Sequence, residues 1–237
     1  MVDIHCHILP GFDDGAGDIQ DTLEMASLAQ ASGTKVIVAT PHCNVPSEPD
    51  NYYSSRYRDA FYSACKALEE ERIPIKLLPG MEVFATYDLP ELIKDNKVLT
   101  INQSNYLLME FAFDEDPEFV EIMVDRVKEI SIKPVIAHPE RYEFIKNDLE
   151  FARLLVEKGC IFQANKGSLL GRYGRRSEET VYKLLKRNLI SLVASDAHSA
   201  EVRTPDMRRA RAAAKEFCDV KKLFEDNPLK ICTNQPL

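Results

Sequence analysis

The sequence predicts an α/β fold built around a parallel β-sheet, and two observations support this prediction. Short runs such as VIVAT, YLLMEF, PVIAH and SLVAS are almost continuously hydrophobic, as strands buried on both faces should be. Amphipathic segments lie between these runs, and a repeated alternation of strand and helix is typical of a parallel sheet. Seven predicted strands can close into a barrel or stay open. In a barrel, the chemistry should gather at the carboxyl ends of the strands.

The predicted elements follow one another along the chain. VDIHC opens the sequence as a strand, and Asp18 is placed to cap the helix after it, with Gly33 just past the end of that helix. The strands are predicted at residues 2–6, 35–40, 75–83, 106–111, 134–138, 160–165 and 190–195. The helices are predicted at residues 18–32, 54–72, 117–130, 149–158, 178–188 and 205–217.

Length and composition are those of an ordinary globular protein. The 237 residues are 45% hydrophobic and 29% charged, which suits one large domain over residues 1–237 better than two small ones. The net charge of -8 argues against a protein that binds nucleic acid or an anionic membrane through a basic surface. No apolar run approaches the roughly 20 residues that span a bilayer, and no secretion signal follows Met1. We therefore expect a cytoplasmic protein without membrane insertion.

All five histidines stand at the end of a predicted strand or just after it. His5 and His7 lie in DIHCH, and their spacing points both imidazoles to one side of an extended chain. Asp196 and His198 in SDAH repeat this spacing after the last strand. The remaining two histidines are His42, after VIVAT, and His138, at the end of PVIAH. A lone histidine at a strand end is usually an ordinary polar residue, but five of five at such positions favour a metal site.

Carboxylates fall at equivalent places. Asp14 lies in the loop after the first strand, Glu82 lies in GMEV and Glu110 lies in LLMEF. These acids could be ordinary edge charges, but an acid inside LLMEF is costly to bury without a partner, and a bound cation is a natural partner. The candidate donors exceed what one cation takes, so we expect two or three divalent ions, and a mixed imidazole and carboxylate set suits Mn, Fe or Zn. The nine donors are His5, His7, Asp14, His42, Glu82, Glu110, His138, Asp196 and His198.

Together these motifs resemble those of a known family. The chain is similar to the bacterial PHP-type (polymerase and histidinol phosphatase) protein-tyrosine phosphatases of capsule and exopolysaccharide operons. The resemblance runs from residue 1 to about residue 205 and rests on MVDIHCHILPGFDDGAGD, ATPHCN, LPGMEV, LLMEF, IAHPERY, ANKGSLLGRYG and ASDAHS. It implies a distorted, TIM-like (β/α)7 barrel, the PHP domain, with a trinuclear metal centre.

The resemblance also implies roles for individual residues. Arg141 in HPERY and Arg203 in AEVRTP match the family's phosphate-contacting arginines. The implied metal groups are His5 and His7 with Glu82 and Asp196, Glu82 with Glu110 and His138, and Asp14 with His42 and His198.

The implied reaction is hydrolysis of phosphotyrosine on the tail of a cognate bacterial tyrosine kinase, which regulates capsule or exopolysaccharide synthesis. Mn2+ is the expected ion, with Fe and Zn as alternatives. Metal-activated water attacks phosphorus in line, and Arg141 neutralises phosphoryl oxygens. A phosphatase that acts through cysteine needs the sequence C-x5-R, and no cysteine of this chain has Arg six residues later. The thiol mechanism is therefore excluded.

Two other functions stay open. A PHP phosphoesterase for a small phosphomonoester such as histidinol phosphate would share the ligands and differ in the pocket. A non-catalytic metal-binding or kinase-docking regulator would have no reason to retain the complete ligand set, so that set argues against it. Neither GxxxxGK[ST] nor GxGxxG occurs, and nucleotide-cradling loops are not predicted.

Four remaining features each have two interpretations. A basic loop after the sixth strand either contacts an acidic phosphopeptide or is simply solvated; it carries Arg172, Arg175 and Arg176. A group of tyrosines either lines the mouth of the site or packs in the fold; it comprises Tyr52, Tyr53, Tyr57 and Tyr62. The six scattered cysteines predict free thiols, with Cys6 and Cys43 as small fillers rather than extra metal ligands. Residues 221–237 form either a terminal helix or a tail under the barrel.

Overall fold

The strands of the described residues form two sheets, and every pairing in them is parallel. The computed structural model describes residues 1–46 and 51–237. The first sheet has the order β1–β2–β4, with bounds Val2–Cys6, Val36–Ala39 and Lys76–Pro79. The second has the order β3–β5–β6–β7–β8–β9, with bounds His42–Cys43, Glu82–Phe84, Tyr106–Glu110, Lys133–Ala137, Ile161–Asn165 and Leu192–Ala194. The predicted parallel α/β fold is confirmed.

The two sheets together form one distorted barrel. β2 breaks and the chain resumes as β3, and β4 breaks and resumes as β5, so each of these pairs fills one strand position. Backbone hydrogen bonds of 2.8 Å close the seam between β9 and β1, from Asp196 N–H to the His5 carbonyl and from His7 N–H to the Ala197 carbonyl. The part of the chain that the structure describes thus has seven strand positions, as a distorted (β/α)7 barrel requires.

The predicted strand 75–83 is wrong as a single strand, because it divides at Gly80 into β4 and β5. The Gly80 N–H donates to the Tyr57 hydroxyl at 3.1 Å, and the Gly80 carbonyl accepts from the same hydroxyl at 3.0 Å. This backbone therefore pairs with a side chain instead of a neighbouring strand. A Cβ at Gly80 would lie 2.7 Å from Val38 Cγ1, so the close approach of the chains there requires glycine.

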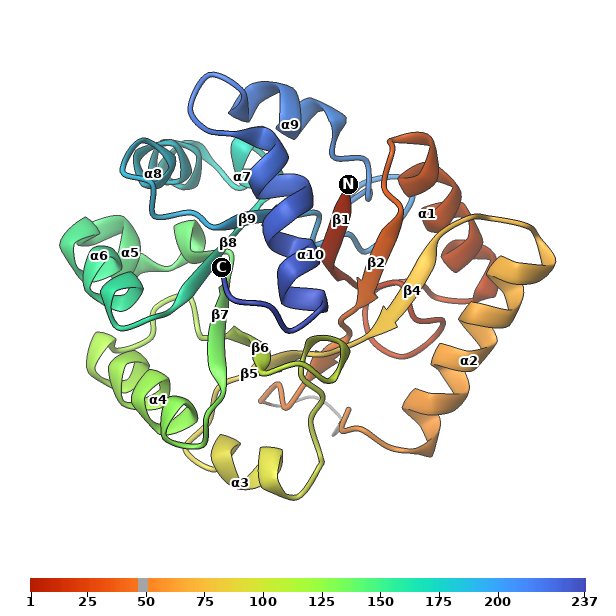
Figure 1. Ribbon diagram of the computed structural model, residues 1–237, viewed down its shortest axis with the longest axis horizontal. Helices are drawn as coiled ribbons and strands as arrows, with labels where there is room; N and C mark the ends of the chain where they lie inside the picture. The colour runs from red at the N-terminus through yellow and green to blue at the C-terminus, as the bar shows by residue number, and fades with distance from the viewer. Residues whose placement is uncertain (47–50) are drawn as a thin grey trace.

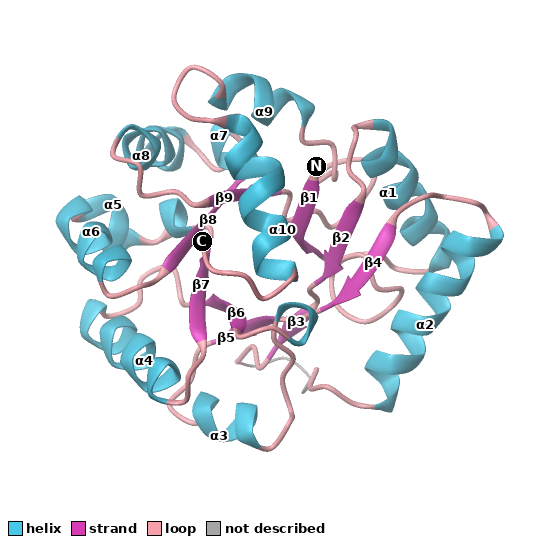
Figure 2. Cartoon of the chain, in the orientation of Figure 1, coloured by secondary structure: helices cyan, strands magenta, loops and turns pink. Residues whose placement is uncertain are grey.

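Helices surround the barrel, as Figures 1 and 2 show. The first begins where predicted, because the Asp18 carboxylate accepts from the N–H groups of Gln20 and Asp21. The predicted helix 205–217 is too long, because Lys166 Nζ donates to the Asp206 carbonyl at 3.0 Å and holds that residue in a loop. The helices α1 to α10 are Ile19–Ala31, Ser55–Glu70, Leu89–Lys94, Pro117–Glu129, Glu143–Asn147, Leu149–Glu157, Lys166–Leu169, Arg175–Lys186, Arg208–Ala214 and Asn227–Cys232.

The C-terminal segment closes the amino ends of the strands. A π-helical turn at Lys222–Asp226 continues into α10, which lies across this end of the barrel in Figure 1. The Tyr106 hydroxyl at the start of β6 donates to the Gln235 carbonyl at 2.7 Å. Apolar side chains pack together there, among them Ile231 with Val2, Ile4, Leu108, Val135 and Leu192. Residues 221–237 therefore form a terminal helix that also packs under the barrel.

No helix in residues 1–46 and 51–237 combines the length and the apolar character needed to cross a membrane.

Candidate metal centre

The carboxyl ends of the strands bring together all nine donors predicted from the sequence. The ring centroids of His7 and His198 lie 3.7 Å apart, those of His7 and His42 4.5 Å apart, and those of His5 and His138 5.9 Å apart. Each of the four carboxylates has an oxygen within 3.6 Å of at least one imidazole nitrogen. Side chains from residues 5 to 198 thus meet at one edge of the barrel.

Two of these donors stand on unusual backbone. His138 directly follows β7 with a φ of 34°, and Asp196 follows β9 with a φ of 49°. Residues other than glycine rarely adopt this left-handed region, and such conformations cluster at functional sites. In both cases the turn that ends the strand is made at the candidate ligand itself.

His5 in β1 and His7 just after it are each held by a polar contact at Nδ1. Their Nε2 atoms lie 3.2 Å apart, so both rings face one side, as the spacing predicts. The Nδ1 of His5 contacts Gln163 Oε1 at 2.8 Å, and the Nδ1 of His7 contacts Asp13 Oδ2 at 2.7 Å. An acceptor at Nδ1 favours a proton there and leaves the lone pair of Nε2 directed into the site.

The loop between β1 and α1 wraps closely around His7. The Asp13 side chain is buried, and its Oδ2 accepts a second hydrogen bond, from the N–H of His42 at 2.8 Å. Its Oδ1 accepts from the N–H of Gly15 at 3.0 Å. A Cβ at Gly15 would lie only 2.0 Å from the His7 carbonyl oxygen, so this loop can close only over glycine.

Asp14 faces the opposite way from its neighbour and is the most exposed of the nine donors, at 63% of its side chain. Its Oδ1 lies 3.3 Å from His198 Nε2 and 3.6 Å from His42 Nε2. The close polar contact with His198 lowers the pKa of this carboxyl, and the nearby imidazoles outweigh the opposing effect of burial.

Glu82 is the centre of the cluster, because its two oxygens reach four imidazoles. Oε1 lies 3.2 Å from His5 Nε2 and 3.1 Å from His138 Nε2. Oε2 lies 3.4 Å from His7 Nε2 and 3.1 Å from His42 Nδ1. Burial raises the pKa of Glu82, but these imidazoles together hold it well below its ordinary value. An ionised carboxylate ringed by nitrogen donors has the position of a bridging ligand.

The pKa values of His5 and Glu110 indicate that the cluster favours added positive charge. Burial lowers the pKa of the His5 imidazole, but the negative charges of Glu82 and Asp196 outweigh burial and raise it to about 9. Burial and the charge of Glu82 raise the pKa of Glu110 to about 8, so this acid resists ionisation. Both raised pKa values show that the surroundings of these two groups favour added positive charge. A bound cation would supply that charge.

The donor set fits divalent cations. Three groups have donor atoms within 4.8 Å of one another: His5, His7 and Asp196; His7, Asp14, His42 and His198; and His42, Glu82 and Glu110. Among the described residues, four buried atoms in the cluster have no partner in hydrogen-bond geometry, namely His42 Nδ1, Glu82 Oε2, His138 Nδ1 and His198 Nε2. Buried polar atoms are nearly always satisfied, so these orphaned atoms point to a missing ligand.

The three groups differ from those that the family resemblance implies. Glu82 is absent from the group of His5, His7 and Asp196, and His7 joins the group of Asp14, His42 and His198. Glu82 and Glu110 group with His42, whereas the resemblance implies His138. The Nε2 of His138 nevertheless lies 3.1 Å from Glu82 and 3.5 Å from Glu110.

Two arginines border the cluster. Arg203 Nη2 donates to Asp196 Oδ1 at 2.5 Å, and Arg141 Nη1 lies 3.6 Å from Asp196 Oδ2. The guanidinium carbon of Arg141 lies 4.4 Å from the ring centre of Phe113 and 4.3 Å from that of Tyr173. This guanidinium therefore lies close to two aromatic rings, which restrict its motion and fix the orientation of its plane.

The cluster opens through a cavity of about 440 Å³. Phe84 and Phe113 contribute aromatic rings to its lining, and Phe113 is 45% exposed. Among the described residues, none of the four predicted tyrosines lines this cavity. Tyr57 is buried on Gly80, and Tyr62 is exposed on α2, so the packing interpretation holds for Tyr57.

The basic loop and the cysteines lie outside the cluster. Arg172 donates to the Val202 carbonyl, and the other two arginines of the loop pair with neighbouring acids, Arg175 with Glu179 and Arg176 with Glu143. None of the six cysteines forms a disulfide, as predicted, and none joins a donor group among the described residues.

The residues at the site that were not predicted from the sequence include Asp13, Gln163, Phe84, Phe113 and Tyr173. Two of them carry a recognisable signal. Gln163 is a polar residue inside the apolar strand IFQAN, and Asp13 is one of two adjacent acids in the DDG loop. The two aromatic rings around Arg141 carry no such signal, because their contact depends on the meeting of two loops.

Comparison with known proteins identifies the family. A family model described as "Capsular polysaccharide synthesis, CpsB/CapC" matches residues 1–233. The chain belongs to the CpsB/CapC family. It is 36% identical over 242 residues to the tyrosine-protein phosphatase YwqE of Bacillus subtilis (strain 168), covering 100% of this chain and 93% of that protein. It is 29% identical over 248 residues to the tyrosine-protein phosphatase CpsB of Streptococcus pneumoniae, covering 99% of each.

Solved structures agree with this family. A Bacillus subtilis YwqE crystal structure, reported with Streptococcus pneumoniae CpsB as "unique metal-dependent tyrosine phosphatases", matches with a TM-score of 0.93 at 36% identity. The match covers 100% of this chain and 96% of that one. A β-aspartyl dipeptidase from Fervidobacterium islandicum AW-1 matches with a TM-score of 0.51 at 14% identity over 98% of this chain and 72% of its own, and this likeness concerns the fold alone. The CpsB/CapC chain thus has a barrel that distant hydrolases share.

Proposed function

We propose that this chain is a metal-dependent protein-tyrosine phosphatase, a phosphoric monoester hydrolase that serves capsular polysaccharide synthesis. Relatives matched over nearly their whole length are tyrosine-protein phosphatases. The observation that carries the proposal is the meeting of nine nitrogen and oxygen donors with two arginines at one edge of the barrel. Metal ligands beside arginines are the combination that hydrolysis of a phosphate ester needs.

The nine donors are proposed to hold two or three divalent cations, with Glu82 as the bridge between them. Asp14, His42 and His198 would hold one ion, and His5, His7, Asp196, Glu110 and His138 would hold the others. Bound there, the ions supply Lewis acidity toward phosphoryl oxygens and lower the pKa of a coordinated water. The mixed imidazole and carboxylate set supports Mn2+, with Fe and Zn as alternatives.

Arg141 and Arg203 are proposed to bind the phosphoryl group. A guanidinium presents paired N–H donors that match two phosphate oxygens. Arg141 is already restricted by its contacts with Phe113 and Tyr173, so little of its freedom is lost on binding. The Arg203 side chain lines the cavity and is partly exposed there, which leaves guanidinium N–H donors available for the substrate.

The mouth of the cavity supports an aryl phosphate ester as the substrate. Phe84 and Phe113 place aromatic surface beside the donors, where a phenyl ring can stack or pack edge to face. A phenolate leaving group has a conjugate pKa near 10, so it needs less protonation than an alkoxide and can leave without a dedicated acid.

Activity and metal content test this proposal together. We expect the purified protein to hydrolyse p-nitrophenyl phosphate with Mn2+, to stop when the metal is removed, and to recover when Mn2+ returns. His5→Ala or Glu110→Ala should abolish turnover, whereas Glu69→Ala, an exposed acid on α2, should leave it unchanged. Full activity with metal content confirmed as nil would refute the metal mechanism.

Substrate profiling separates the proposal from a phosphoesterase for a small metabolite. A phosphotyrosine peptide should be hydrolysed with a higher kcat/KM than histidinol phosphate, because histidinol phosphate has no aryl ester to place against Phe84 and Phe113. The natural substrate is proposed to be the phosphotyrosine tail of a bacterial tyrosine kinase, and the chain is proposed to act in the cytoplasm. The reverse preference would favour the small-metabolite function.

A further inference from the structure

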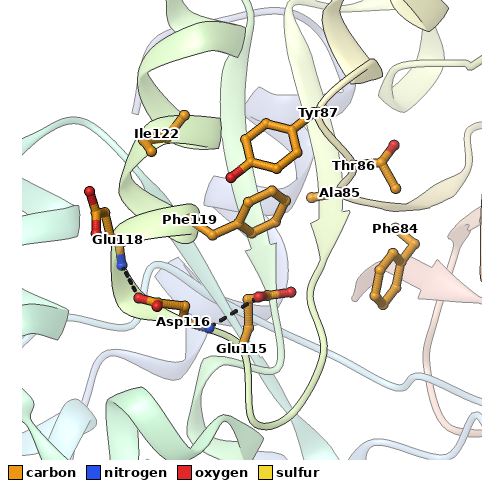
Figure 3. Close-up of a pocket in the computed structure, with 9 residues that line it drawn as sticks. All are labelled: Phe84, Ala85, Thr86, Tyr87, Glu115, Asp116, Glu118, Phe119 and Ile122. Carbon is orange, nitrogen blue, oxygen red and sulfur yellow. Dashed lines mark hydrogen bonds between the residues drawn. The ribbon is translucent and has the colours of Figure 1, made fainter.

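A second hollow adjoins the metal centre, and we name it the flanking groove. It has a volume of about 570 Å³ and lies between the loop that leaves β5 and the beginning of α4. The residues used below are Phe84, Tyr87, Glu115, Glu118, Phe119 and Ile122, all shown in Figure 3. Both bordering segments follow the carboxyl ends of strands, so the groove lies on the same edge of the barrel as the metal donors.

The groove adjoins the cavity of the metal centre, because Phe84 lines both. Phe84 follows Glu82 by two residues on β5, and Glu82 is the centre of the donor cluster. A peptide whose phosphate lies on the metals must leave the cavity along its wall. In an extended peptide each residue advances the chain by roughly 3.3 Å, so the residues directly beside the phosphotyrosine stay close to this wall.

The floor of the groove is apolar and accessible. Tyr87 is 60% exposed and packs edge-on against Phe119, with the ring centres 4.8 Å apart. Ile122 is 38% exposed on the first turns of α4. Figure 3 shows Tyr87 and Phe119 side by side above the acidic loop. Exposed rings of this size favour an apolar side chain of a partner.

The rim of the groove is negative. The segment DEDPE at 114–118 carries four carboxylates. Asp116 caps α4 by accepting from the Glu118 N–H, and Glu115 accepts from the Asp116 N–H, as Figure 3 shows. In the described part of the chain, no basic side chain forms an ion pair with any of the four. The rim therefore complements a cationic side chain and repels an acidic one.

We propose that the flanking groove binds the residues beside the phosphotyrosine of a protein substrate, with an apolar side chain on Tyr87 and Phe119 and a lysine or arginine at Glu115 and Glu118. The assignment rests on the proposed phosphatase function and names its substrate class. It commits to a peptide segment because the groove shares Phe84 with the cavity of the metal centre, and because its apolar floor and negative rim together match an apolar-basic sequence.

Two phosphotyrosine peptides of equal length test the groove, one with Leu and Lys beside the phosphotyrosine and one with Gly and Glu at the same positions. The intact enzyme with Mn2+ should prefer the first by about tenfold in kcat/KM at low salt, and 0.5 M NaCl should shrink the preference because it screens exposed charges. The double variant Glu115→Lys/Glu118→Lys should reverse the preference. It should hydrolyse p-nitrophenyl phosphate at the wild-type rate, because that substrate has no flanking residues.

A matched control carries the same change of charge at the other end of the barrel. Glu69 and Glu71 are exposed at the end of α2, which runs back from the carboxyl edge, and Glu69→Lys/Glu71→Lys should leave the peptide preference unchanged. Tyr87→Ser, at an exposed position, should lower kcat/KM for the Leu-Lys peptide severalfold and spare p-nitrophenyl phosphate. Thermal unfolding checks that each variant is folded.

The possible outcomes separate the two proposals. Equal peptide preference in the wild type and in Glu115→Lys/Glu118→Lys would overturn the groove while p-nitrophenyl phosphate hydrolysis still supports the phosphatase. A reversal by the α2 control as well would show a long-range effect of net charge and would also overturn the groove. Failure of the wild type on every phosphate ester would instead remove the phosphatase function.

Discussion

The two ends of this barrel are built from the same strands but bury opposite kinds of side chain, apolar at one end and charged at the other. At the amino end, Ile231 of α10 packs among Val2, Leu108 and Val135, and all four of these apolar side chains are buried. At the carboxyl end, Glu82 is just as buried and lies among imidazoles. The first end stabilises the fold by excluding water, whereas the second buries charge that water would otherwise solvate.

The contrast teaches that stability and function are divided along the length of the strands. Burial opposes the ionisation of Glu82 and the protonation of His5, and the attraction between the carboxylates and imidazoles of the cluster offsets that cost. A cluster of this kind gains its full stability when cations bind to the folded state alone. Three predictions test the division, beginning with the largest effect.

Removal of the metal should destabilise the protein through its carboxyl end. A ligand present at about 1,000 times its Kd adds about 4 kcal/mol to the free energy of unfolding, if it binds only the folded state. For a chain of this size that corresponds to a loss of roughly 10 °C in Tm on chelation. Thermal unfolding in Mn2+ and in chelator measures the difference. In Glu82→Gln, which lacks the central carboxylate, the difference should nearly vanish.

A Tm that is independent of metal in the wild type would contradict the division, because the cluster would then be stable without cations.

Ile231→Ala should destabilise the amino end without touching the site. Loss of a fully buried isoleucine leaves a cavity and lowers the free energy of unfolding by about 3 kcal/mol. Because the strands are roughly 16 Å long, the two ends should behave additively, and the loss should be the same with and without Mn2+. Chemical denaturation in both conditions measures it. Leu229→Ala on the same helix, at a side chain that is 47% exposed, is the matched control and should cost under about 1 kcal/mol.

A change in Mn2+ affinity in Ile231→Ala would show that the two ends are coupled and would contradict the division between stability and function.

The sequence predicts these two ends unequally, for physical reasons. The carboxyl end is visible because its donors are unusual residue types at strand ends, as in DIHCH and SDAH. The closure of the amino end is not, because DNPLKIC is short and its apolar residues show only that it packs somewhere. The break at Gly80 is hidden as well, since it depends on a hydroxyl from Tyr57, a residue that lies 23 positions away.

The same limit applies inside the site. His7 is predicted from spacing alone, but the residue that orients it is not, because the DDG loop offers two adjacent acids and only the fold decides which one turns inward. Asp14 reaches His198, and Asp13 takes the buried position behind His7. The ligand types could be read from the sequence, whereas the residues that hold them in place follow from contacts between segments.

Asp13→Asn tests this orienting role and is the smallest of the expected effects. The amide keeps the shape of the side chain but removes the negative charge that accepts from His7 Nδ1 and from the His42 N–H. Loss of such a partner behind a metal-binding histidine typically weakens metal affinity by about 10–100-fold. Calorimetric titration of the metal-free protein with Mn2+ measures the affinity directly. Asp18→Asn, which retains the cap of α1 because asparagine caps as well as aspartate, should bind Mn2+ like the wild type. An unchanged affinity in Asp13→Asn would mean that the loop backbone alone fixes His7, and that the carboxyl end owes its order to packing as much as the amino end does.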